Sequence, residues 1–481
     1  MEDFNNSLKS WIDNEMAAAE LINIASRLWY EKSIELILLR SVVVNRGSGK
    51  ILNKHIRAET ILKKPVRVQD SLLIARAILE EDVAPARIDI GRLNSEWTDE
   101  KDQYPSVNAF VRRKLKAFIG VPPRSTHTQD VVLYGFGRIG RILARELALF
   151  AGDGSHLRLR AIVTRSNKPE EIRKRVSLFR RDSVHGAFPG VANEDLDNSC
   201  MIINGQIIHF IAAQQPEDID YTAYGIENAL VIDNTGVYRN RENLSRHLQS
   251  KGVSKVLLTA PGKGDIPNVV YGVNHHDLPL EDEKIFSAAS CTTNAIVPAL
   301  QLFEKKYGIV KGHIETIHAY TNDQNLLDNY HPKSRRGRSA PLNMVITETG
   351  AGSAAAKAIP SLKSKLTSNA VRVPVPNVSL AILTIELDQI VSVQDVNDMF
   401  LDASLRGTLI EQIRYSNATE FVSSDGIGDS CPSIFDSPAT KVSEDGKTAI
   451  VYLWYDNEFG YASQVVRLAR HIGKVKSYRY Y

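Results

Sequence analysis

A glycine-rich turn between a strand-like run and a helix-like run constrains this sequence most. "VVL" (131–133) is followed by "GFGRIG" (135–140), and then by a run in which apolar residues recur three and four positions apart. Glycine at these places permits a tight turn and lets a pyrophosphate approach the backbone N–H groups at a helix N-terminus. This context favours dinucleotide binding over a turn that only packs a helix. The residues predicted to contact the dinucleotide are Gly135, Phe136, Gly137, Arg138, Ile139 and Gly140.

The next strand-like run lacks the acidic residue that commonly completes this fingerprint. "LRAIVT" ends at Thr164 and is followed by Arg165 and Ser166. A carboxylate at this place accepts hydrogen bonds from the adenosine ribose, whereas an arginine accommodates a 2′-phosphate. The alternative interpretation is that Arg165 points to solvent. The predicted cofactors are therefore NADP, NAD or both.

The chain divides near residue 125, where "IGVPPRSTHTQD" has the composition of a linker. Before it, residues 1–125 are predicted to be mostly helical, with Asp70 and Ser106 as helix caps. After it, strands alternate with helices, which predicts an α/β fold with a Rossmann-type doubly wound parallel sheet. From about residue 310 longer strands predict an α+β catalytic domain with a mixed or antiparallel sheet. The expected domains are 1–125, 126–290 completed by a C-terminal helix over 457–481, and 291–456.

Bulk properties exclude several classes of protein. The formal net charge is only +3, so nothing indicates a nucleic-acid or membrane partner. The three cysteines are too few and too scattered for a disulfide framework, which favours a reducing, cytoplasmic location. We find neither a signal peptide nor a charge-free apolar run of about 18 residues. We expect no metal site.

"SAASCTTNAIVP" (287–298) places Cys291 between a strand-like run and a helix-like run. Helix N-terminal amides and a nearby imidazolium stabilise a thiolate, so Cys291 is a candidate nucleophile; a small buried cysteine is the alternative. A nucleophilic cysteine is usually activated by a histidine. His318, in "ETIHAYTNDQ", and His185, in "DSVHG", are rival candidates for that base.

From "YGFGRIGR" to the end, the sequence resembles phosphorylating glyceraldehyde-3-phosphate dehydrogenases. The stretches that carry the resemblance occur in family order: "GFGRIGR", "DSVHG", "NTGVY", "LTAPGKG", "GVNHHDL", "SAASCTTNAIVP", "HAYTNDQ", "TGAGSAAAKAIP", "VRVPVPNVS" and "WYDNEFGYASQV". Residues 1–125 have no counterpart in the typical enzyme. The resemblance implies a homotetramer that acts on a sugar phosphate and inorganic phosphate, in glycolysis or gluconeogenesis.

The resemblance also implies roles for individual residues. Cys291 would attack the aldehyde and His318 would lower the thiol pKa and act as the general base. The substrate phosphate would be bound by Thr321, Asp323 and Arg372, and the attacking phosphate by Ser290, Thr349, Gly350 and Arg336, with Arg335 and Arg338 as alternatives to Arg336; Thr292 belongs to the same binding set. Thr235, Gly236 and Asn457 would contact the cofactor, with Asn457 holding the nicotinamide amide.

The match departs from the family pattern at four places. Tyr134 replaces an asparagine before the first glycine, Arg165 replaces the usual aspartate, and Tyr330 stands where NAD-specific members commonly have proline. The fourth departure is the extension. The tract around Tyr330 is similar to erythrose-4-phosphate dehydrogenase. Two alternatives therefore stay open: activity on erythrose 4-phosphate, and a catalytically silent member with a binding or regulatory role.

Overall fold

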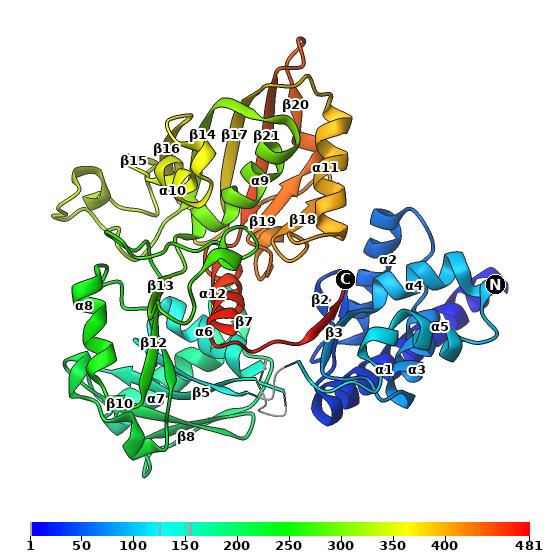
Figure 1. The fold of residues 1–481 in the computed structure, drawn as a ribbon, viewed down its shortest axis with the longest axis horizontal. Helices are drawn as coiled ribbons and strands as arrows, with labels where there is room; N and C mark the ends of the chain where they lie inside the picture. Colours follow the sequence, from blue (N-terminus) through cyan, green and yellow to red (C-terminus); the bar gives the residue numbers. More distant parts are fainter. Residues whose placement is uncertain (1, 125–126, 150, 153–155) are drawn as a thin grey trace. The chain divides into compact units, whose positions relative to one another are not determined.

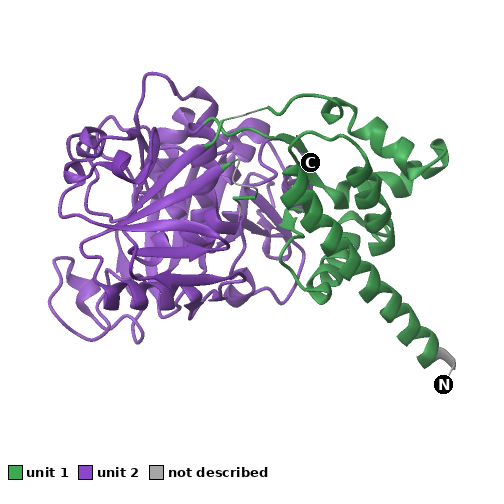
Figure 2. Cartoon of the chain, turned by 90° about the horizontal axis from the view of Figure 1, so that it is seen from below, with its two compact units in different colours: residues 1–128, 151–156, 474–481 green, residues 129–150, 157–473 purple. Residues whose placement is uncertain are grey.

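The computed structural model describes residues 2–124, 127–149, 151–152 and 156–481. The chain divides into two compact units: unit 1 comprises residues 1–128, 151–156 and 474–481, and unit 2 comprises 129–150 and 157–473 (Figure 2). The expected boundary between residues 125 and 126 lies outside the described residues. The expected division of residues 126–481 into a dinucleotide-binding and a catalytic domain stays a prediction.

Unit 1 is mostly helical, as predicted, and encloses a small sheet. Its helices are α1 (Glu2–Lys32), α2 (Ser48–Leu62), α3 (Val68–Glu80), α4 (Ile90–Glu100) and α5 (Val107–Lys114). Ser106 caps α5, because its side chain accepts a hydrogen bond from the N–H of Ala109. Asp70 caps no helix: α3 begins two residues earlier, after Arg67, and Asp70 lies in its first turn.

The sheet of unit 1 takes its last strand from the C-terminal segment. The strands are β1 (Glu35–Leu38), β2 (Ser41–Val42), β3 (Ala86–Asp89) and β22 (Tyr478–Tyr480), in the order β2-β1-β3-β22. The helix expected over 457–481 is shorter: α12 spans Phe459–Ile472 and ends at Gly473. Residues 474–481 leave unit 2, and Tyr478–Tyr480 pairs in parallel with β3.

Unit 2 contains the predicted Rossmann-type sheet (Figure 1). Its order is β13-β12-β11-β4-β5-β10-β9-β8, and the six strands from β13 to β10 are parallel. The bounds are β4 (Gln129–Tyr134), β5 (Leu157–Thr164), β8 (Ala192–Asp195), β9 (Cys200–Ile203), β10 (Gln206–Ala212), β11 (Ala229–Asp233), β12 (Val253–Leu258) and β13 (Ile285–Ser287). Helices α6 (Arg138–Leu149), α7 (Pro169–Arg180) and α8 (Arg241–Ser245) accompany them, and β6 (Arg181–Asp182) pairs with β7 (Gly186–Ala187). The strand order reverses direction at β4, so the glycine turn lies at a topological switch point, where such sheets bind ligands.

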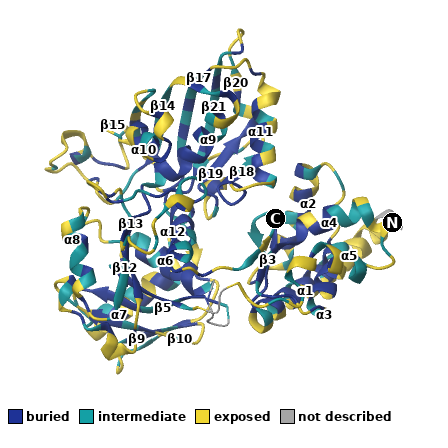
Figure 3. Cartoon of the chain, viewed as in Figure 1, coloured by how far each residue is buried: buried dark blue, intermediate teal, exposed yellow. Residues whose placement is uncertain are grey.

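The second sheet of unit 2 is mixed, as predicted. Its order is β15-β16-β14-β17-β21-β19-β18, with β20 paired to β21. The bounds are β14 (Ile309–Ala319), β15 (Val345–Thr347), β16 (Leu366–Val373), β17 (Ser379–Leu387), β18 (Ile413–Ser416), β19 (Ser433–Asp436), β20 (Lys441–Val442) and β21 (Thr448–Tyr455). Helices α9 (Cys291–Tyr307), α10 (Ala351–Ala358) and α11 (Val393–Leu405) pack with it around a buried core (Figure 3). This core fixes both α9 and β14, which carry the candidate nucleophile and base.

Candidate active site

Cys291 is the first residue of α9. Ser290 caps this helix, because its Oγ accepts a hydrogen bond from the N–H of Thr293 at 3.0 Å. Ala289 turns the chain sharply from β13 into α9 with a φ of 54°, a left-handed conformation that costs a non-glycine residue about 1–2 kcal/mol. The first N–H groups of α9 have no acceptor within the helix, so they favour negative charge on the Cys291 sulfur.

His318 lies beside this sulfur. The Nε2 atom is 3.5 Å from Cys291 Sγ, and Nδ1 is 2.7 Å from the carbonyl oxygen of Ala319. β14 and β16 are parallel, and their register pairs His318 with Arg372. The Arg372 guanidinium donates to the same carbonyl at 2.9 Å. His185, the rival base, is bonded instead to Asp456.

Burial disfavours the charged forms of both the Cys291 thiol and the His318 imidazole. Burial raises the pKa of the Cys291 thiol, and the positive charge of Arg372 opposes that effect. The pKa of His318 is lowered to about 3, first because the ring is buried and second because Arg372 lies beside it. Burial and the charge of Arg372 together therefore favour the neutral imidazole over a resting imidazolium.

A cavity of about 440 Å³ opens over this pair. The predicted residues that line it are Ser290, Cys291, Thr292, His318, Arg336, Thr349, Gly350 and Arg372. Three cations that sequence analysis did not single out, Arg239, Lys333 and Lys357, line it too. Among the described lining residues, Glu348 is the only carboxylate, so the cavity favours anions. Lys333 belongs to the basic tract "KSRRGR", the one sequence signal that could have indicated it.

Two predicted phosphate ligands, Thr321 and Asp323, lie outside the cavity wall, and Asp323 binds a residue in it. Asp323 accepts hydrogen bonds from Thr321 and from Arg336, and Arg336 Nη2 also donates to Thr347 Oγ1 at 3.0 Å. Of the three arginines in "SRRGR", only Arg336 is among the described residues that line the cavity. Arg338 points elsewhere and pairs with Asp328 at 2.8 Å.

The glycine turn leaves room for a dinucleotide. A Cβ on Gly137 would meet nothing within 4 Å, whereas one on Gly140 would lie 2.5 Å from Asn234 Oδ1. Gly135 has a φ of 102°, which permits the turn from β4 into α6. Asn234 Oδ1 is buried and has no hydrogen-bond partner within the described chain. The open backbone beside a helix N-terminus fits a pyrophosphate.

The end of β5 carries no carboxylate. Arg165 is exposed there, and within the described chain its guanidinium has no hydrogen-bond or ion-pair partner. Gln214 Nε2 donates a hydrogen bond to the backbone carbonyl oxygen of Arg165 at 3.2 Å. The guanidinium is therefore free to meet a phosphate.

Asn457 is held in a defined orientation by a residue that sequence analysis missed. Ser379 Oγ donates to Asn457 Oδ1 at 3.0 Å and accepts a hydrogen bond from the N–H of Ala319 at 3.1 Å. The Asn457 Nδ2 group has no acceptor in the described part of the chain, which leaves it available to a ligand amide. Ser379 thus connects the predicted nicotinamide ligand to the strand of His318.

Comparison with known proteins decides the family. Residues 129–241 match the profile of the glyceraldehyde 3-phosphate dehydrogenase NAD binding domain, and residues 290–457 match that of the C-terminal domain of the same enzyme. The chain belongs to the glyceraldehyde-3-phosphate dehydrogenase family. It therefore contains the NAD-binding domain of that family.

Individual members of the glyceraldehyde-3-phosphate dehydrogenase family differ in how much of the chain they cover. A glyceraldehyde-3-phosphate dehydrogenase-like protein of Pseudomonas aeruginosa is 44% identical over 458 residues, which are 95% of this chain and 98% of the relative. A glyceraldehyde-3-phosphate dehydrogenase of Zymomonas mobilis is 39% identical over 345 residues, 72% of this chain and 98% of the relative. The chloroplastic A enzyme of Zea mays is 39% identical over 350 residues, 72% and 84% respectively. A match as long as the first has to include most of residues 1–125.

Within the described residues, no helix combines the length and apolarity that crossing a membrane requires. The same residues contain no group of three or more histidine, cysteine or acidic side chains that could hold a metal ion.

Proposed function

We propose that this protein is a phosphorylating glyceraldehyde-3-phosphate dehydrogenase that uses NADP or NAD. The observation that carries the proposal is Cys291 Sγ at 3.5 Å from His318 Nε2, at the N-terminus of α9. Both face a cavity lined by Arg336 and Arg372. The reaction converts glyceraldehyde 3-phosphate and inorganic phosphate to 1,3-bisphosphoglycerate, reversibly.

The pair accounts for the covalent chemistry. The Cys291 sulfur attacks the aldehyde carbon while the thiol proton passes to His318 Nε2, and the imidazolium then protonates the new alkoxide. His318 removes the same hydroxyl proton when C1 is oxidised. When bound, the nicotinamide ring accepts the hydride that leaves C1. The product is a thioester on Cys291.

The cations of the cavity account for the phosphate chemistry. Arg372 and the Thr321–Asp323 pair are assigned to the substrate phosphate, and Arg336, Ser290, Thr349 and Gly350 to inorganic phosphate. A phosphate oxygen attacks the thioester carbon, and the Cys291 thiolate leaves, which releases the acyl phosphate. Guanidinium groups suit both steps because they bind phosphate oxygens through paired N–H donors.

One assay tests the proposal. Glyceraldehyde 3-phosphate and erythrose 4-phosphate are each supplied with NAD or NADP, with and without inorganic phosphate, and nicotinamide reduction is followed. We expect phosphate-dependent reduction with the triose phosphate and none with the Cys291→Ser variant, which should still bind the cofactor. Well-folded protein without activity in any combination would instead support a silent, binding or regulatory member.

Erythrose 4-phosphate remains the second candidate substrate, because of the tract around Tyr330. Activity with that sugar alone would select it. Thr321, next to Asp323, and Thr349, in the cavity wall, supply the hydroxyls expected of the triose enzyme and favour glyceraldehyde 3-phosphate.

The assembly, location and domain limits belong to the same proposal. We expect a homotetramer in the cytoplasm, in glycolysis or gluconeogenesis. The functional domains would be 1–125, 126–290 with the C-terminal helix, and 291–456. Mass measurement in solution tests the assembly.

A further inference from the structure

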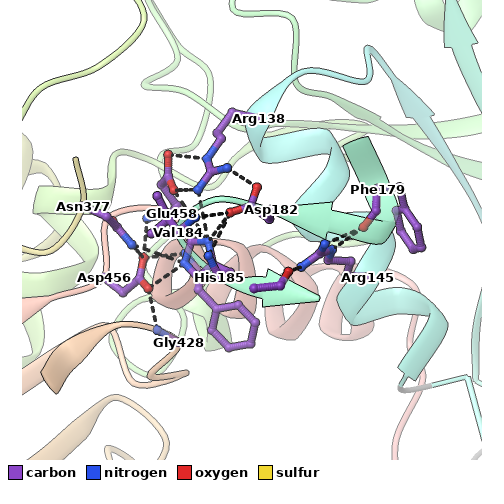
Figure 4. Close-up of polar contacts among 12 residues, drawn as sticks. Arg138, Arg145, Phe179, Asp182, Val184, His185, Asn377, Gly428, Asp456 and Glu458 are labelled. Atoms are coloured by element: carbon purple, nitrogen blue, oxygen red, sulfur yellow. Dashed lines mark hydrogen bonds and ion pairs between the residues drawn. The ribbon is translucent and has the colours of Figure 1, made fainter. Parts of the chain in front are cut away.

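A buried ion network surrounds His185, far along the sequence from the Cys291–His318 pair (Figure 4). The His185 side chain is 5% exposed and its Nε2 lies 2.9 Å from Asp456 Oδ2. Its Nδ1 lies 3.5 Å from Asp182 and 3.8 Å from Glu458. Asp182 Oδ1 in turn accepts a hydrogen bond from the N–H of His185 at 2.8 Å. The imidazole therefore lies among three carboxylates.

Asp456 organises the loop that contains Asn457. Its Oδ1 accepts hydrogen bonds from the N–H groups of Glu458 at 3.0 Å and Phe459 at 2.8 Å, and from Asn377 Nδ2 at 2.9 Å. Its Oδ2 accepts from the N–H of Gly428 at 2.8 Å as well as facing His185. The Asp456 side chain is fully buried. Its orientation consequently sets the backbone on both sides of Asn457.

Arg138 joins this loop to the glycine turn. Its Nη2 donates to Glu458 Oε2 at 2.6 Å and lies 3.2 Å from His185 Nδ1, and its Nη1 donates to Asp182. Arg138 is the first residue of α6. One connected set of side chains therefore spans from the pyrophosphate turn to the residue flanking Asn457.

We propose that His185 is a positioning residue for the nicotinamide: through Asp456 it holds Asn457 in the orientation that receives the nicotinamide amide. The inference rests on the proposed function, because that function gives Asn457 its ligand. His185 touches neither the substrate pair nor the open side of the glycine turn. Among its contacts, the one with Asp456 at 2.9 Å leads to Asn457.

Charge supports this arrangement. Burial disfavours the imidazolium, but the hydrogen bond to Asp456 and the charges of Asp456 and Glu458 outweigh it, so the pKa of His185 is raised. The pKa of Asp456 is lowered despite its burial, because His185 bonds to it. Removal of the imidazole would leave Asp456 buried with no cationic partner beside it, and the loop would rearrange.

The test compares NAD⁺ with ADP-ribose, which lacks the nicotinamide. Binding of both to the full-length protein is measured by calorimetry for wild type, His185→Gln, Asn457→Ala and the double variant. We expect His185→Gln to weaken NAD⁺ about tenfold and ADP-ribose by less than about twofold, the loss of roughly one net hydrogen bond. In the Asn457→Ala background, His185→Gln should change NAD⁺ binding no further.

The controls separate positioning from general damage. His313→Gln alters a partly exposed histidine of β14, and both affinities should stay at wild-type values. If His185→Gln does not fold, Asp456→Asn is measured in the same way, with the same selective loss of NAD⁺ expected. Equal weakening of NAD⁺ and ADP-ribose, or no weakening of either, would overturn the inference. Binding is measured without substrate, so an absence of turnover would contradict the proposed function alone. Failure of the wild-type protein to bind NAD⁺, NADP⁺ and ADP-ribose would refute both the proposed function and the inference about His185.

Discussion

At the scale of single residues, the site depends on positive charges placed beside reactive groups. Arg372 opposes the effect of burial on Cys291 and lowers the pKa of His318. Arg165 is exposed at the end of β5. We expect these two arginines to affect different properties, the reactivity of the thiol and the choice of cofactor, so they can be tested separately.

Arg165→Asp should shift cofactor preference from NADP toward NAD. The substitution exchanges a guanidinium, which would attract a 2′-phosphate, for a carboxylate, which would repel it and accept hydrogen bonds from a ribose. We expect the ratio of kcat/KM for NADP to that for NAD to fall about tenfold or more. Arg173→Asp, on α7, is the matched charge control. An unchanged ratio would show that Arg165 does not contact the cofactor.

Arg372→Gln should make Cys291 less reactive. Loss of the positive charge raises the pKa of the thiol further, so the thiolate fraction at neutral pH falls. We expect iodoacetamide to alkylate Cys291 at least roughly threefold more slowly at pH 7.5. The pH at which the alkylation rate rises should move to a higher value. Arg338→Gln, whose side chain is 65% exposed, should leave the rate unaltered. Equal rates in the two variants would contradict the assigned effect.

At the scale of elements, helix α12 joins the dinucleotide-binding part of unit 2 to the part that contains the second sheet. α12 packs against α6 of the dinucleotide-binding sheet and also contacts α9. Between α6 and α12, the buried carboxyl of Glu146 accepts a hydrogen bond from Ser463 Oγ at 2.8 Å. A carboxyl group in such a place costs stability when it ionises.

The stability of unit 2 should therefore fall as the pH rises toward 8. Burial raises the pKa of Glu146 from 4.5 to about 8. Between these values the folded protein keeps a proton that the unfolded chain has lost, so each pH unit removes up to about 1.4 kcal/mol. Glu146→Gln should flatten this dependence in urea unfolding at pH 6, 7 and 8. The exposed substitution Glu444→Gln should retain the wild-type slope; a wild-type slope in Glu146→Gln would refute the assignment.

The elements near the glycine turn and Cys291 were predictable, because each is specified by nearby residues. Periodicity predicts α6 and α9, and Ser106 has the short polar side chain of a cap. The prediction that Asp70 caps a helix was wrong, because the apolar stripe of α3 begins at Val68, two residues before Asp70. Ser379, Arg239 and Lys357 were missed, since only tertiary packing brings them to the site.

At the scale of the whole molecule, the extension is more than an N-terminal appendage. Its sheet includes β22, and Tyr478 packs on Phe118 with ring centroids 5.1 Å apart. The guanidinium of Arg92 lies 4.7 Å from the centroid of the Tyr480 ring. The sequence around Tyr478–Tyr480 did not predict the pairing of β22 with β3, because a strand of three residues carries no pattern that identifies its distant partner. A variant lacking the extension should accordingly also lack residues 474–481.

Removal of residues 474–481 should destabilise unit 1 and spare unit 2. The deletion removes the pairing of β22 with β3 and the packing of two tyrosines, a loss of about 2 kcal/mol or more. We expect faster proteolysis within residues 1–124 and a lower melting transition for that part. Lys476→Ala, an exposed substitution in the same segment, should leave both unchanged. A deletion variant with wild-type proteolysis would show that β22 is dispensable.

The pairing of β3 with β22 also has a consequence during synthesis. β3 comprises residues 86–89 and β22 residues 478–480, so the ribosome makes the partner strand roughly tens of seconds later, at usual elongation rates. Throughout that interval β3 has a bare edge, which is the kind of surface that recruits strands from other nascent chains. The first unit to emerge is thus the last to become complete, and the edge of β3 stays unpaired by β22 until the end of synthesis.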